Sequence, residues 1–342
     1  MPFKIFVTGA TGYIGGDALY ALSSRHPEFE YALLVRTQEK ADAVQKKYPQ
    51  TRIVLGELGD AELLKKEAAR ADIVIHTADA SDNEGAAKAI AEGLVEGHTA
   101  SKPGYWLHTG GSGILTYFDS EADRLGEWEE KEFNDYSGVE ELTHLPDEAF
   151  HRNVDQIVLK CGTEHADVVK TAIVCPPTIY GEGRGPISGR GRQVYELAKL
   201  VLQKGYAPVI GKGKARWNNI HVHDLSEAFR LLVEAAVFRN GSKDLWGDKG
   251  YYFVERGEHV WGDLARTVAG QAKELGFIKS DEEYQLGKDE ALNVAGFEAV
   301  SWGLNSRGKA ERLNKVLGWT PRECSMEEEV PRILKAEKER LG

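Results

Sequence analysis

The first half of the chain alternates short apolar runs with longer segments of helical character. The apolar runs do not alternate with polar residues, so both faces of each predicted strand are expected to be buried. Strands of this kind, each followed by a helix, form a parallel sheet that helices cover on both sides. Six strands are predicted, at 4–8, 31–36, 51–56, 71–78, 104–110 and 168–175. Helices are predicted after the first four strands, ending near Ser24, Tyr48 and Arg70 and, for the fourth, covering 84–99.

The turn between the first strand and the first helix is rich in glycine. It reads TGATGYIGG, which places Gly9, Gly12 and Gly15 at G-x-x-G-x-x-G spacing. Small residues in such a turn let backbone N–H groups reach a pyrophosphate at the positive end of the helix. A tight turn alone also favours glycine, but the strand before it and the helix after it are the context that the dinucleotide fingerprint requires. The turn predicts a dinucleotide site that includes Gly9, Thr11, Gly12, Tyr13, Ile14 and Gly15.

The end of the second strand distinguishes the two nicotinamide dinucleotides. An acidic residue there accepts hydrogen bonds from a free ribose 2′-hydroxyl, whereas an arginine accommodates a 2′-phosphate. The second strand ends in LLVRTQ, so Arg36 favours NADP(H), with Thr37 as a second phosphate contact. A solvated surface arginine is the alternative, and it would leave NAD(H) as the cofactor.

The second half of the chain follows a looser pattern. An acidic, irregular insert is predicted at 116–148, and the regular alternation ends near residue 175. A chain of 342 residues also exceeds the size at which a single core usually keeps growing. We therefore predict an α/β fold with a doubly wound parallel Rossmann sheet at 1–175 and a smaller C-terminal α/β lobe at 176–342. That lobe is expected to bind the substrate, with some of its segments returning to the Rossmann domain.

Composition narrows the class of protein. A net charge of -11 opposes binding to nucleic acid, and no basic run overrides it. The three cysteines, Cys161, Cys175 and Cys324, have no CxxC or disulfide spacing, which is typical of reduced thiols in a cytoplasmic protein. The apolar run at the N-terminus is too short for a secretory signal or a membrane span. We expect a cytoplasmic protein with no membrane or nucleic-acid partner.

The order and spacing of several motifs resemble the extended, atypical short-chain dehydrogenases/reductases, and most closely their epimerase/dehydratase, dihydroflavonol-reductase and NmrA-like groups. These motifs are the glycine turn, GELGD at 56–60, VIHTAD at 74–79, LHTGGSG at 107–113 and PPTIYGEG at 176–183. The resemblance implies that Glu57 and Leu58 flank the adenine, and that Thr77, Ala78 and Asp79 line the pyrophosphate and ribose. It also implies that Pro176, Thr178 and Ile179 pass the nicotinamide, and that a homodimer is a plausible assembly.

The catalytic positions of that family are altered in this chain. The family usually has two hydroxyl residues after the fifth strand, where this chain has Thr109, Gly110 and Gly111, with Ser112 one place later. The catalytic tyrosine of the family falls on His151, and its lysine falls on Asp155. Residues four apart share one face of a helix, so these two side chains are expected to point into the same cleft.

A histidine next to a carboxylate can still donate a proton to a reduced carbonyl. His151 is therefore the candidate proton donor, Asp155 its orienting group or a ribose ligand, and Thr109 or Ser112 the carbonyl contact. The alternative is an exposed ion pair of helical spacing that contributes only a few tenths of a kcal/mol.

Three other features receive weaker interpretations. His221 and His223 have metal-binding spacing but no evident third ligand, so no metal site is predicted. GRGPISGRGR at 183–192 is either a mobile lid or a solvated basic loop. C-terminal aromatic residues suggest a hydrophobic or aromatic substrate, although most aromatic side chains fill cores; they are Trp217, Tyr251, Tyr252, Phe253, Trp261 and Trp302.

Taken together, the sequence predicts an NADP(H)-dependent reductase or dehydrogenase of a small carbonyl compound. Two other hypotheses remain open. One is a redox-inactive regulator that binds the dinucleotide, as NmrA-like proteins are thought to do. The other is an isomerase or lyase on the same fold, in which His151 acts as a base.

Overall fold

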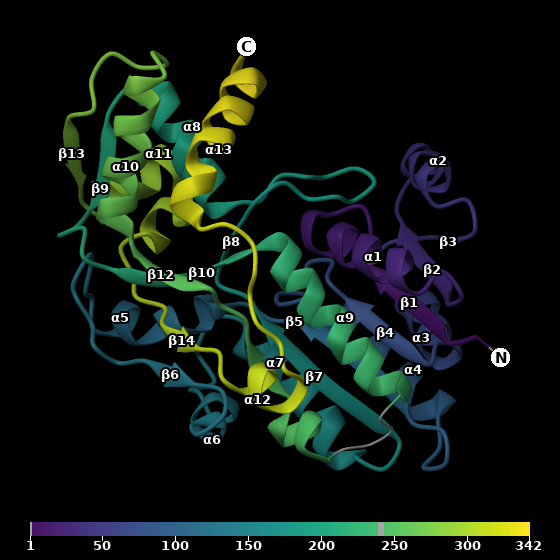
Figure 1. The fold of residues 1–342 in the computed structure, drawn as a ribbon. Coiled ribbons are helices and arrows are strands. Elements are labelled where there is room, and N and C mark those ends of the chain that lie inside the picture. The colour runs from purple at the N-terminus through teal and green to yellow at the C-terminus, as the bar shows by residue number, and fades with distance from the viewer. Residues whose placement is uncertain (1, 239–242) are drawn as a thin grey trace.

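A computed structural model describes residues 2–238 and 243–342, and its centre is a parallel sheet of seven strands (Figure 1). The strand order is β3-β2-β1-β4-β5-β7-β11, which is the Rossmann order with one further strand at the edge. Every neighbouring pair in this sheet is parallel. The strands are β1 (Lys4–Thr8), β2 (Glu30–Val35), β3 (Arg52–Leu55), β4 (Ile73–His76), β5 (Gly104–Thr109), β7 (Val169–Cys175) and β11 (Tyr251–Phe253).

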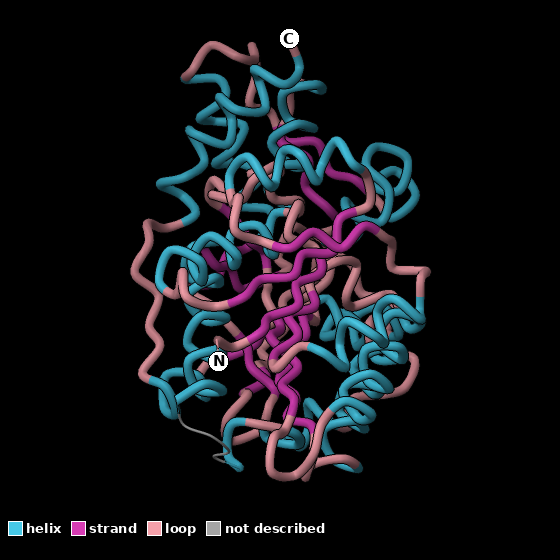
Figure 2. Tube along the Cα trace, turned by 90° about the vertical axis from the view of Figure 1, so that its right-hand side faces the viewer, coloured by secondary structure: helices cyan, strands magenta, loops and turns pink. Residues whose placement is uncertain are grey.

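Helices cover both faces of this sheet, as Figure 2 shows from the side. One core cluster joins the sheet to α1 (Tyr13–Arg25), α2 (Gln38–Lys47), α9 (Val222–Phe238) and α12 (Arg312–Leu317). The other joins it to α3 (Ala61–Arg70), α4 (Glu84–Gly97), α6 (Val139–Thr143) and α7 (Arg152–Glu164). The doubly wound architecture predicted from the apolar runs is therefore confirmed.

Polar residues define where the covering helices begin. The side chains of Thr37, Asp60 and Asn83 accept hydrogen bonds from backbone N–H groups in the first turns of α2, α3 and α4. Each of these residues directly follows the strand or loop that leads into its helix, so the caps fix the strand-to-helix turns. The predicted strands and helices of the first half are present, with ends that differ by at most three residues.

A second lobe packs around its own core in the C-terminal half. Its helices are α8 (Gln193–Lys204), α10 (Trp261–Glu274), α11 (Lys288–Ser301) and α13 (Met326–Leu341), which Figure 1 shows together at the upper left around β9 and β13. The paired strands β9 (Ala207–Ile210) and β13 (Glu283–Leu286) lie against them. A three-stranded sheet of β8 (Thr178–Tyr180), β10 (Arg216–His221) and β12 (Gly257–Val260) completes this half.

The segment after residue 175 is thus divided between the Rossmann domain and the second lobe. Strand β11 extends the Rossmann sheet, and α9 and α12 pack on one of its faces, while the remaining helices form the second lobe. Two further 3-10 turns in this half are Lys243–Leu245 and Gly247–Lys249.

The insert at 116–148, predicted to be irregular, contains short regular elements. A 3-10 turn at Ser112–Thr116 leads into α5 (Tyr117–Glu121), and β6 (Phe133–Asn134) pairs with β14 (Gly308–Lys309). Phe133, Val139 and Leu142 are buried in the core beneath α7. Their scattered spacing has neither helical nor strand periodicity, which is why the pattern did not predict these elements.

Candidate active site

A cleft of about 890 Å³ runs from the carboxyl ends of the central strands to the second lobe. This volume suits a dinucleotide-sized ligand, and the carboxyl edge of a doubly wound sheet is where such ligands bind. Fourteen of the residues expected to bind the cofactor line the cleft: Gly9, Thr11, Gly12, Tyr13, Ile14, Gly15, Arg36, Glu57, Leu58, Thr77, Ala78, Asp79, Pro176 and Ile179.

The glycine turn forms a close-packed cradle at the start of α1. A Cβ built on Gly15 would lie 2.2 Å from Oγ1 of Thr77 and 2.5 Å from the carbonyl oxygen of Gly9, so only glycine fits there. Gly9 itself has φ +81°. Gly12 begins the helix without a side-chain cap, and the first turn of α1 contains no acidic residue. The N–H groups of this turn are therefore available to a pyrophosphate, and the residues present fit that group.

Arg36 follows β2 directly and lines the cleft, as do Glu57 and Leu58. Among residues 2–238 and 243–342, no ion-pair partner of Arg36 is found. Oγ1 of the neighbouring Thr37 accepts the N–H of Lys40 as the cap of α2. The guanidinium group thus stays free to contact a ligand phosphate.

His151 faces the cleft from the end of the loop before α7. Its Nδ1 lies 2.7 Å from Oδ1 of Asp82, a residue that follows β4 and that the sequence analysis did not name. This hydrogen bond holds the pKa of Asp82 below its usual value. Because Asp82 accepts the proton on Nδ1, the other ring nitrogen, Nε2, is directed elsewhere, toward the loop at Gly111 and Gly113.

Gly110 and Gly111 lie beside Asp155 and His151, the two residues that stand where the resembling family has its lysine and tyrosine. A Cβ on Gly111 would lie 3.2 Å from Nε2 of His151, and a Cβ on Gly110 would lie 3.4 Å from Oδ1 of Asp155 and 3.1 Å from Ile173. A side chain at position 111, where the resembling family has a hydroxyl residue, would press against the imidazole, whereas one at position 110 would crowd Ile173 and only touch the carboxyl group. The glycine at position 111 therefore makes room for the histidine.

Ser112 also lines the cleft and is buried. Its Oγ lies 2.9 Å from Oγ of Ser306, whose hydroxyl is also 2.6 Å from the carbonyl oxygen of Ser112. Ser306 thus fixes Ser112 within the loop at 111–113, which lies next to His151.

Three residues that were expected at the site do not line the cleft, namely Thr109, Asp155 and Thr178. Thr178 and Ile179 are neighbours on β8 and point to opposite faces, so Ile179 faces the cleft and Thr178 is fully buried on the other side. Thr109 ends β5 with its side chain buried in the protein, and the residues after it, 110–113, line the cleft. The predictions for Thr109 and Thr178 as contact residues are therefore corrected.

Asp155 does not line the cleft, and the hydrogen-bond partner of His151 is Asp82 rather than Asp155. His151 precedes α7 in a left-handed conformation, with φ +70°, so the two residues are not on one continuous helix. Oδ2 of Asp155 accepts a hydrogen bond from the hydroxyl of Tyr251, at 3.1 Å. Its other oxygen, Oδ1, has no hydrogen-bond partner among the described residues. Burial raises the pKa of Asp155 to about 6.

The loop at 181–192 is fastened to both lobes through its arginines. Arg184 forms a bidentate pair with the buried Asp17 of α1. Arg190 pairs with Glu337 of α13 and Glu196 of α8. Each arginine of this loop has a carboxylate partner, since Arg192 pairs with Glu298 of α11. In this arrangement the segment is neither a freely solvated loop nor an open lid.

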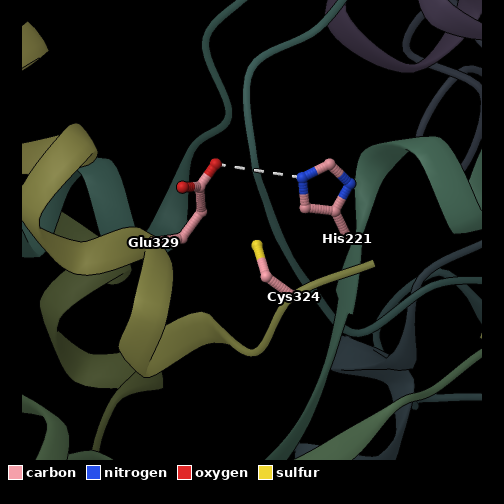
Figure 3. Close-up of side chains that lie close together, drawn as sticks. All are labelled: His221, Cys324 and Glu329. Carbon is pink, nitrogen blue, oxygen red and sulfur yellow. Dashed lines mark ion pairs between the residues drawn. The ribbon is translucent and has the colours of Figure 1, made fainter. Parts of the chain in front are cut away.

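A second polar cluster lies outside the cleft, where His221, Cys324 and Glu329 come together from β10, the loop before α13 and α13 itself (Figure 3). Their ligand atoms all lie within 4.8 Å of one another. Nε2 of His221 is 3.9 Å from Oε1 of Glu329. The H-x-H pair thus has neighbours that the sequence spacing did not reveal.

The hydrogen bonds of His221 assign it to helix capping rather than to metal binding. Its Nδ1 accepts the backbone N–H of His223 in the first turn of α9, at 3.1 Å. The hydrogen of the neutral ring is therefore on Nε2, so the nitrogen that faces Glu329 has no lone pair to offer a metal. Burial lowers the pKa of His221 to about 4, which keeps the ring neutral near pH 7.

The C-terminal aromatic residues proposed for the substrate pocket are mostly core residues. Of these, only Trp217 lines the cleft. The others are buried among the strands and helices of the two lobes: Tyr251, Tyr252, Phe253, Trp261 and Trp302. The cleft is also bordered by Tyr13, which was expected there, and by Phe150 and Phe297, which the sequence analysis did not select.

Comparison with known proteins agrees with this geometry. A family model described as NAD(P)H-binding matches residues 9–158. The fold is similar to DesIV, a dTDP-glucose 4,6-dehydratase from Streptomyces venezuelae with NAD and TYD bound, at a TM-score of 0.68 and 16% identity over 98% of this chain and 97% of that chain. It is also similar to the UDP-glucose 4-epimerase of Thermotoga maritima with UDP-glucose, at a TM-score of 0.65 and 14% identity over 99% of this chain and 100% of that chain.

The chain thus binds a nicotinamide dinucleotide through an NAD(P)H-binding domain, on a fold that it shares with these dehydratase and epimerase structures. It belongs to the same family as a protein of Acremonium sp named "Oxidase ucsJ", to which it is 40% identical over 100% of this chain and 99% of the relative. Among the described residues, no helix has both the length and the apolar character needed to cross a membrane.

Proposed function

We propose that the protein is an NADP(H)-dependent reductase of a small carbonyl compound, with His151 as the proton donor. The observation that carries this proposal is the contact between Nδ1 of His151 and Asp82, at 2.7 Å, with Nε2 directed toward the Gly111–Gly113 loop that lines the cleft. A bound nicotinamide would supply the hydride. The alcohol forms when the carbonyl carbon gains this hydride and the oxygen gains the proton from Nε2.

Asp82 is the positioning residue of this pair. Its carboxylate holds the hydrogen of Nδ1 and stabilises the imidazolium, so that Nε2 carries the proton to be transferred. Asp82 is about half exposed, and solvent therefore weakens this stabilisation. Ser112, fixed by Ser306, lies beside the same loop, and its hydroxyl is the proposed second contact to the carbonyl oxygen.

Arg36 supports NADP(H) over NAD(H) within this proposal. The guanidinium group lies at the adenosine end of the cleft, where a 2′-phosphate would extend. The exposed side chain has no ion pair among the described residues, so its charge is available to that phosphate.

The test is a screen of aldehydes and ketones with NADPH, read from the loss of nicotinamide absorbance. We expect His151→Ala to lower kcat by about a hundredfold or more, which is the usual contribution of a general acid. His144→Ala is the matched control, because His144 is exposed on the surface and does not line the cleft. Asp82→Asn should lower kcat with little change in KM, because the imidazole loses the carboxylate that orients its ring.

The rival functions give different results in the same screen. Tight dinucleotide binding without turnover of any compound would favour the redox-inactive regulator. Conversion of a substrate with no net change in the cofactor would favour the isomerase or lyase. Reduction that is unaffected by His151→Ala would remove the imidazole from the mechanism.

A further inference from the structure

The end of the cleft beside His151 is walled by two exposed aromatic rings. Phe150 and Phe297 are 45% and 52% exposed, although both are large apolar side chains. The Phe150 ring packs on the imidazole of His151, with centroids 3.6 Å apart. Phe297 meets Phe150 edge to face, with centroids 5.9 Å apart. Exposed aromatic surface in a cleft is typical of a ligand-binding wall.

The backbone of α11 places Phe297 in this wall. The helix is broken at Ala295 and Gly296, and Gly296 has φ +65° and ψ −155°. This is a conformation that glycine adopts almost alone. The break separates the first part of α11 from the short second part, which contributes Phe297, Glu298 and Ser301 to the cleft. Phe297 comes from the second lobe and Phe150 from the Rossmann domain, so the two rings meet across the cleft.

The charges at this end of the cleft are already paired. Nε of Arg192 lies 2.8 Å from Oε2 of Glu298, and the side chain of Glu298 is only 12% exposed. Arg190 is held by Glu196 and Glu337. A diphosphate would need free cations here, and it would also meet the carboxylate of Glu298. The arrangement therefore disfavours a nucleoside diphosphate and favours an uncharged, flat ligand.

We propose that this cleft selects an uncharged planar aromatic carbonyl compound and rejects nucleoside diphosphate sugars, with Phe150 and Phe297 binding the aromatic part and Glu298 excluding the phosphates. The inference rests on the proposed reductase function, whose substrate class it names. It separates this chain from DesIV and the epimerase, whose structures contain TYD and UDP-glucose.

The test measures binding rather than turnover. Naphthamide, which has a planar ring system and a carbonyl but is not reduced by hydride transfer, is titrated calorimetrically into the complex of the protein with NADP⁺. We expect Phe297→Ala to weaken its binding about tenfold or more, since a well-placed aromatic contact and its buried area together exceed about 1.4 kcal/mol. Phe297→Leu, which keeps an apolar side chain and removes the ring, should lose a smaller part of the affinity.

Leu292→Ala is the matched control. Leu292 is an exposed apolar residue of the same helix but lies before the break and does not line the cleft, so its replacement should leave naphthamide binding unchanged. UDP-glucose, titrated in the same way, should bind more weakly than naphthamide. Glu298→Gln should strengthen UDP-glucose binding several-fold, because the carboxylate is removed and Arg192 is released.

The inference is overturned if UDP-glucose binds the unaltered protein more tightly than naphthamide, or if Phe297→Ala binds naphthamide as well as the parent does. Comparing turnover of naphthaldehyde and butyraldehyde with NADPH separates this inference from the proposed function. Naphthamide binding that depends on Phe297 without reduction of either aldehyde would refute the reductase and leave the ligand class standing. Preferential reduction of butyraldehyde would refute the ligand class and leave the reductase standing.

Discussion

The buried carboxyl group of Asp155 makes the stability of the fold depend on pH in a direction that can be measured. One of its oxygens accepts the Tyr251 hydroxyl, and the other has no hydrogen-bond partner among the described residues. Burial raises its pKa from the usual 3.8 to about 6. The folded protein thus binds this proton more tightly than the unfolded chain does.

The sign of the effect follows from that difference. Well below pH 3.8 the carboxyl group is neutral in both states, and it does not oppose folding. As the pH rises toward about 6 and beyond, the unfolded chain ionises freely while the folded state must bury the charge or hold the proton. A difference of about two pKa units corresponds to a loss of about 3 kcal/mol.

Asp155→Asn removes this titration. The asparagine still accepts the Tyr251 hydroxyl, and its buried amide adds a cost that does not vary with pH. Denaturant unfolding of the variant and the parent, measured from about pH 4 to about pH 8, should show a difference in unfolding free energy that moves by about 3 kcal/mol in favour of the variant. Asp167→Asn is the matched control, because Asp167 is exposed in the turn that follows α7. Parallel curves for the parent and Asp155→Asn would refute the reasoning.

Two further predictions concern the cleft. Arg36→Asp should weaken NADPH binding about tenfold or more and improve NADH binding, because the charge that would meet the 2′-phosphate is reversed. Fluorescence titration with both cofactors measures the two affinities. Affinities that do not differ between the parent and the variant would contradict this prediction. Gly111→Ala should lower kcat about tenfold with little change in the affinity for NADPH, because the added Cβ would lie 3.2 Å from Nε2 of His151 and displace the imidazole. Unaltered turnover in this variant would show that the imidazole does not need its present position.

The features that could be predicted from sequence are those that depend on residues close together in the chain. The apolar runs defined the strands, and the glycine turn defined the cradle of the dinucleotide, because both are local patterns. The face of Thr178 was also predictable, since its neighbour Ile179 lines the cleft and strand residues alternate. Only one face of that strand can line the cleft, so the motif as a whole does not.

The contacts that define the catalytic end could not be read from spacing. Asp82 and His151 are 69 residues apart, and only the order of β4 and β5 in the sheet brings their loops together. The position of Asp82 just beyond a central strand was a usable signal, because functional groups gather at the carboxyl ends of such strands. The left-handed backbone of His151 had no signal, since residues other than glycine seldom adopt it.

Phe297 shows the same limit in the second lobe. Its position in the cleft depends on the break in the helix at Gly296. A single glycine in a helical pattern does not predict such a break, because a continuous helix can also contain one. The aromatic residues near it in the sequence, such as Trp302, belong to the core. Exposure, which the sequence does not give, is what distinguishes the two groups.

In the proposed reductase, the positive φ of His151 sets catalysis and folding in opposition at a single residue. A glycine there would relieve about 1 kcal/mol of backbone strain, so selection for stability alone would replace the histidine. A lineage that lost its chemistry would drift toward glycine or asparagine at this position. Among proteins related to this chain, those that keep a histidine at this position would therefore be the ones that keep the proposed activity.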